Sequence, residues 1–188
     1  ANYPVALQGK TIAGYAVAIE NVATGRQTLN TELLTALTET VAGMTNGTQT
    51  TGVLLTGLGD VAFKTTYEKW VGEHASASEN LSAWYIPTLS QLSAFMGTLF
   101  TMKDVPATGS EDFKNIPEFE FVNGKMFDRE TIATVNYASS TINNQGNVSG
   151  VRINVADGVV TNAQEAGISV KTALNQQALC RPMITIFK

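Results

Sequence analysis

The stretch WYIPTLSQL at residues 84–92 combines a strand-forming half with the start of a helix. Its first three residues are bulky side chains that favour extended structure and can anchor a core. Pro87 then keeps the residue before it out of the helical region. Thr88 and Gln91 have the T-x-x-Q spacing of a capping box, which marks the first turn of a helix. We therefore predict a core segment that leads directly into a helix.

Patterns on either side of this stretch predict further helices. Apolar residues recur at helical spacing behind Thr88, so the helix that begins there should reach about Phe100. Asp60 is placed to cap an earlier helix that runs to about Glu73. Another helix is expected to open at residues 29–31, with leucines on one side.

The remaining segments carry turn signals or β-forming residues. Residues 45–59 are rich in Thr and Gly and are expected to form a loop around a short apolar piece. They lack the G-K-[ST] ending of a phosphate-binding loop. Residues 101–117 and 163–177 are polar, and we expect a long loop and a polar excursion there. Strands are predicted at Tyr15–Glu20, Val135–Ser139, Val148–Asn154, Val159–Asn162 and Ala178–Phe187, with a hairpin over Pro117–Phe127.

Two helices in the first half and an antiparallel β second half indicate an α+β fold. The length of 188 residues fits one domain, residues 1–188, with a core that needs no disulfide. Residues 1–10 are expected to be a flexible or trimmed N-terminal segment. We see no linker that splits the chain.

The composition argues against several classes of function. Charged residues make up 15% of the chain, the net charge is −4 and there is no basic run, so nucleic-acid binding is not expected. No apolar run approaches the ~18 residues of a membrane span, which leaves a lipid anchor upstream of the chain as the route to a membrane. A polar but weakly charged surface is common outside the cell, so we expect an extracellular or cell-surface location.

A single cysteine and a single histidine limit catalytic and metal chemistry. Cys180 lies in an apolar run, and we expect a buried, inert thiol. A catalytic thiol needs a base, but His74 lies in a polar stretch typical of a helix end, so we do not expect the two to pair. The same count excludes a zinc site built from a Cys/His cluster. We expect no metal and no cofactor, and we interpret the acidic pairs at 111–112 and 118–120 as a solvated face.

Arg181 and Pro182 stand together in the last apolar run. A buried arginine must be paired, so we expect a structural ion pair at Arg181. Proline cannot donate to a β ladder, so Pro182 should lie at an edge or a strand break.

Several motifs occur in a fixed order. Residues 84–92 fit the pattern W-Y-[LI]-P-[ST]-x-x-[EQ]-L, and residues 137–141 fit Y-[WA]-S-S-T. Residues 151–160 contain D-G-x-V, and residues 180–187 contain R-P-[VM] and end in Phe. In this order and spacing the chain resembles a bacterial family of C-type-lectin-like surface proteins, a domain of unknown function. The likeness covers about residues 84–187 and is looser in the N-terminal half.

The resemblance implies a compact domain in which the N- and C-terminal strands pair, two helices flank antiparallel sheets, and a long loop region carries binding. Two positions depart from the family pattern. Ala138 stands where Trp is usual, and Gln91 stands where Glu is usual, although Gln91 still serves the cap. The E-P-N, Q-P-D and W-N-D motifs of calcium-dependent sugar binders of this fold are missing, so calcium-dependent sugar binding is not implied.

Asparagine is dense in the second half of the chain. Residues 134–188 hold seven Asn, as many as the preceding 133 residues together. Amides both donate and accept hydrogen bonds, so such a set suits an adaptable binding surface on loops. The alternative is that Asn simply fills turns. Our candidate ligand-binding residues are Tyr137, Asn143, Asn144, Gln145, Asn162, Gln164 and Gln176.

Taken together, these features predict a non-catalytic, adhesin-like ligand-binding module whose partner is a protein or a glycan. One alternative is a structural or receptor-binding subunit of a fimbrial tip or phage fibre. The Asn-rich C-terminal half also resembles the variable proteins that diversity-generating retroelements mutate. A third alternative is an enzyme similar to the formylglycine-generating enzymes of this fold. Those enzymes rely on two cysteines, and this chain has one.

Overall fold

The computed structural model describes residues 7–23, 27–29, 46–76, 78–101, 134–154, 168–171, 174 and 177–188. At 96–101, 134–135, 152–154 and 168–171 the description covers the backbone only. In these parts the helices are α2 (Gly47–Leu58), α3 (Ala62–Glu73) and α4 (Leu89–Thr101). The strands are β1 (Ile12–Val17), β2 (Gln27–Thr28), β3 (Thr134–Ile142), β4 (Val148–Asn154), β5 (Ile168–Lys171), β6 (Gln177–Ala178) and β7 (Met183–Phe187).

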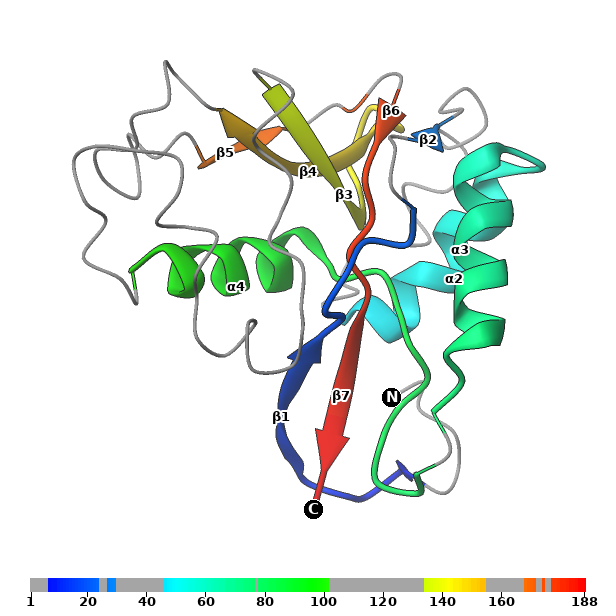
Figure 1. Ribbon diagram of the computed structural model, residues 1–188, viewed down its shortest axis with the longest axis vertical. Helices are drawn as coiled ribbons and strands as arrows, with labels where there is room; N and C mark the ends of the chain where they lie inside the picture. Colours follow the sequence, from blue (N-terminus) through cyan, green and yellow to red (C-terminus); the bar gives the residue numbers. More distant parts are fainter. Residues whose placement is uncertain are drawn as a thin grey trace.

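The described strands form small antiparallel sheets, so the chain has a mixed α+β architecture. β1 pairs with β7, β2 with β6, and β3, β4 and β5 form a sheet in the order β3-β4-β5. The β3-β4-β5 sheet lies at the end of the molecule opposite the C-terminus (Figure 1). The first and last described strands are therefore paired at one end, while the three-stranded sheet occupies the other.

Residues 177–187 connect the two ends. After β6, the amide of Leu179 donates to Asn136 O of β3 at 2.8 Å, and β7 then runs beside β1. Pro182 lies between these pairings, and its carbonyl accepts from Ala18 N at 2.8 Å. The strand predicted at Ala178–Phe187 is thus two short strands, and the break expected at Pro182 is confirmed.

The segment that precedes α4 lies at the centre of the fold. Tyr85 exchanges two backbone hydrogen bonds with Met183 of β7, at 2.9 and 2.8 Å. Ile86 is completely buried, and its N–H donates to Thr51 Oγ1 of α2 at 2.8 Å. The carbonyl of Ile86 accepts from Ser140 Oγ of β3 at 2.7 Å. One short segment therefore joins a helix, the last strand and the three-stranded sheet, as expected of a core anchor.

The capping box predicted before α4 is confirmed. Thr88 Oγ1 accepts from Gln91 N at 3.2 Å, and Gln91 Oε1 accepts from Thr88 N at 3.1 Å. The helix spans Leu89–Thr101, close to the predicted Thr88–Phe100. α3 also matches its prediction in position, but its N-cap is Val61 rather than Asp60, and no side chain caps it.

The prediction of a loop at residues 45–59 is wrong, because this stretch forms α2. Asn46 caps the helix by accepting from Thr48 N at 3.0 Å. The hydroxyls of Thr50, Thr51 and Thr56 bond back to carbonyls one turn earlier, as Thr51 does to Gly47 O at 2.6 Å. Leu54 is fully buried in the core, so packing overrides the weak helix propensity of Thr and Gly. Gly47 is required at the start, since a Cβ there would collide with the Tyr85 ring and the Ile86 carbonyl.

Other boundaries shift in smaller ways. The first strand spans Ile12–Val17 rather than Tyr15–Glu20. β3 extends beyond the predicted Val135–Ser139 to Thr134–Ile142, and β4 matches Val148–Asn154 at both ends. Strand β5 lies inside the polar excursion predicted at 163–177. Predictions at residues 1–6, 30–45, 102–133 and 155–167 lie outside the described residues, including the hairpin over Pro117–Phe127, the strand Val159–Asn162 and nearly all of the helix expected from residue 29.

Candidate functional site

The turn between β3 and β4 is shaped by one of the predicted site residues. Asn143 Oδ1 accepts from Gln145 N and from Asn147 N, both at 2.9 Å. The backbone closes the same turn, because Asn143 N donates to Asn147 O at 2.9 Å and Gly146 N donates to Asn143 O at 3.0 Å. Gly146 has a φ of 78°, a conformation that glycine adopts without strain. Asn143 therefore acts as a positioning residue that orders the turn.

The ordered turn presents two of the predicted amides to solvent. The side chains of Asn144 and Gln145 are exposed, and Asn143 is half-buried beneath them. The structure thus brings three neighbouring candidate residues together in one hairpin turn. Asn162, Gln164 and Gln176 lie outside the described residues.

Tyr137 does not belong to a surface site in this structure. Its relative exposure is 0%, and it lies on β3 between Val151 of β4 and a parallel bridge to Leu179. Gly150 packs against it so closely that an added Cβ would meet the Tyr137 carbonyl and Leu174. Because its side chain is fully buried, Tyr137 is not exposed to contact a ligand at the surface. We therefore count it as support for the hairpin.

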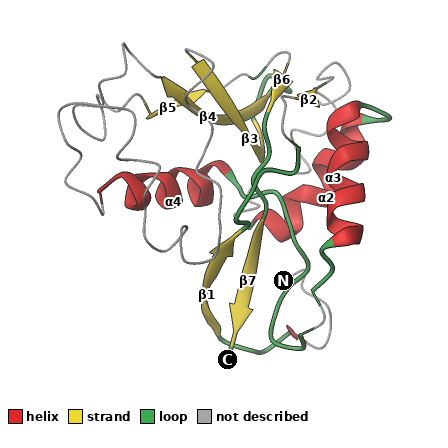
Figure 2. Ribbon diagram, in the orientation of Figure 1, coloured by secondary structure: helices red, strands yellow, loops and turns green. Residues whose placement is uncertain are grey.

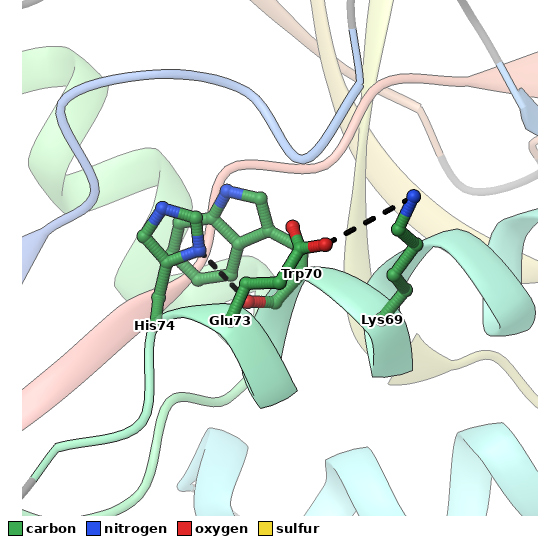
Figure 3. A network of polar contacts seen from close by, with 4 residues as sticks. All are labelled: Lys69, Trp70, Glu73 and His74. Carbon is green, nitrogen blue, oxygen red and sulfur yellow. Dashed lines mark hydrogen bonds and ion pairs between the residues drawn. The ribbon is translucent and has the colours of Figure 1, made fainter.

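A second polar and aromatic cluster, which the sequence analysis missed, lies at the end of α3. The ring of His74 stacks on Trp70 with centroids 4.2 Å apart, and His74 Nδ1 donates to Trp70 O at 2.8 Å (Figure 3). Trp84 packs edge-on against Trp70 at 5.3 Å, and its Nε1 donates to His74 O at 2.7 Å. The i, i+4 spacing of Trp70 and His74 on a predicted helix could have revealed the stack.

The rest of this cluster shows little functional chemistry. Trp70 Nε1 is buried without a hydrogen-bond partner, and Lys69 and Glu73 form an exposed i, i+4 ion pair at 3.9 Å (Figure 3). His74 covers the face of Trp70 that an aromatic binding platform would present. We therefore assign the cluster to anchoring the end of α3 on the segment before α4.

The thiol of Cys180 is buried, as predicted. Burial raises the pKa of this thiol far above its usual range, and the nearby charge of Arg181 lowers the pKa only in part. The pKa of Tyr67 is also strongly raised, mainly by burial and further by Cys180 and Glu68. A thiol held in its protonated form in an apolar environment is a poor nucleophile.

Arg181 is buried and held by Asn21 and the backbone beside it. Its Nε donates to Asn21 Oδ1 at 2.8 Å, and its Nη1 donates to Ala18 O at 3.2 Å. Among the described residues Arg181 therefore fixes the chain that follows β1 to the chain that precedes β7, which is a structural role.

Among the described residues, no three or more His, Cys, Asp or Glu side chains gather in a way that would hold a metal ion. Within the same residues, no helix combines the length and apolar character needed to cross a bilayer.

Comparison with known protein families, with curated proteins and with solved structures finds no match for this chain.

Proposed function

We propose that this protein is a non-catalytic ligand-binding module, extracellular or at the cell surface, that contacts its ligand through the polar turns of its C-terminal β half. The observation that carries the proposal is the β3–β4 turn, in which Asn143 orders the backbone and leaves Asn144 and Gln145 exposed. A turn whose shape is fixed before binding loses less conformational entropy when a ligand docks.

We further propose that the architecture is C-type-lectin-like. Three features support this reading: the antiparallel pairing of β1 with β7, the separate β3-β4-β5 sheet, and helices α3 and α4 connected through the WYIPT segment. In such an arrangement the paired terminal strands form a base and the loops of the second sheet are free to bind. The β3–β4 turn belongs to that second sheet (Figure 2).

The experiment is a binding screen against a glycan array and a panel of candidate surface proteins, with and without calcium. The test variant is Asn144→Ala/Gln145→Ala, which removes both exposed amides and leaves the Asn143 contacts in place. The matched control is Gln8→Ala/Asn80→Ala, which removes two exposed amides near the β1–β7 pair. Two hydrogen bonds lost at a binding surface should weaken affinity by about 10-fold or more.

A ligand that is lost by the turn variant and kept by the control would support the proposal. A ligand that survives in the turn variant, or that requires calcium, would contradict the site. No binding in any arm would favour the alternative of a structural or receptor-binding subunit of a larger assembly.

A further inference from the structure

We draw no further inference here: the strongest candidate, the surface patch formed by the exposed apolar side chains of Ile12, Tyr15 and Ile19 on β1 or just after it, carries nothing because no feature of the described residues shows what covers it.

Discussion

The side chain of Gln91 donates a hydrogen bond from Nε2 to the phenolic oxygen of Tyr85, at 3.2 Å. Its Oε1 accepts from Gly47 N at 3.0 Å and from Thr88 N at 3.1 Å. Tyr85 in turn shares a 3.1 Å hydrogen bond with Thr185 Oγ1 of β7. One amide side chain therefore connects the first turns of two helices with a buried tyrosine that pairs with the last strand.

Gln91→Leu should destabilise the protein by about 2–3 kcal/mol, because two backbone N–H groups lose their acceptor in a partly buried site. Gln91→Glu keeps the acceptors and places negative charge at two helix N-termini, so its cost should stay within about 1 kcal/mol. Urea unfolding at neutral pH measures both. If Gln91→Glu destabilises the protein as much as Gln91→Leu, the hydrogen bond that Gln91 Nε2 donates to Tyr85 matters more than the bonds that Gln91 Oε1 accepts.

Thr51→Val should cost about 2–3 kcal/mol although it preserves the shape of the side chain. The hydroxyl of Thr51 accepts from Ile86 N, and its loss would leave that buried N–H without a partner. Thr56→Val is the matched control on the same helix, since the exposed Thr56 hydroxyl bonds only back to Gly52 O among the described contacts. The control should change stability by about 0.5 kcal/mol or less. Similar losses for both variants would argue against the buried contact.

Gly150→Ala should destabilise the protein by more than about 2 kcal/mol, because the new methyl group would collide with the Tyr137 carbonyl and with Leu174. Gly14→Ala, also in a strand, meets no atom within contact distance and should be neutral or slightly stabilising. Thermal unfolding of the two variants tests the difference. A tolerated Gly150→Ala would show that β3 and β4 pack less closely than described.

Asn143→Ala should cost about 1–2 kcal/mol, because the amides of Gln145 and Asn147 lose their shared acceptor. Asn143→Asp retains an acceptor oxygen and should keep both the stability and the shape of the turn. Hydrogen exchange of these two amides is the direct measurement, and it should accelerate in the alanine variant alone. If the two amides still exchange slowly in Asn143→Ala, the backbone hydrogen bonds of the turn are enough to order it.

Stability should fall as the pH rises above about 8.5, the usual pKa of a cysteine in an unfolded chain. The pKa of Cys180 is raised in the folded state, so as the pH rises the unfolded state loses the thiol proton first. The free energy that this thiol contributes to folding is fully present at lower pH and is lost as the pH rises. The loss due to this thiol approaches about 1.4 kcal/mol per pH unit. Tyr67, with its raised pKa, adds a second loss above about pH 10.

Urea unfolding of the wild type and of Cys180→Ala at several pH values between 7 and 10 isolates the thiol. The alanine variant should start less stable, because it leaves a small cavity, but its stability should decline less steeply above pH 9. If the stability of the two proteins declines equally with pH, Cys180 has the same pKa in the folded and unfolded states.

Local sequence signals determined the elements that depend on neighbouring residues. The T-x-x-Q spacing of Thr88 and Gln91 specified the start of α4, because a capping box closes within one helical turn. The alternation of Val148–Asn154 specified β4, and Pro182 specified the break in the last strand, because proline has no N–H to donate. Local patterning also indicated that Cys180 would be buried.

Only the tertiary structure decided the features that depend on distant partners. Residues 47–58 form a helix because Asn46 caps them and Leu54 packs into the core, although Thr and Gly favour helices weakly. Tyr137 is fully buried on a strand that meets β4 on one side and Leu179 on the other, and no local pattern reveals these distant partners. Propensity is a local property, whereas burial and edge exposure are set by which segments meet in space.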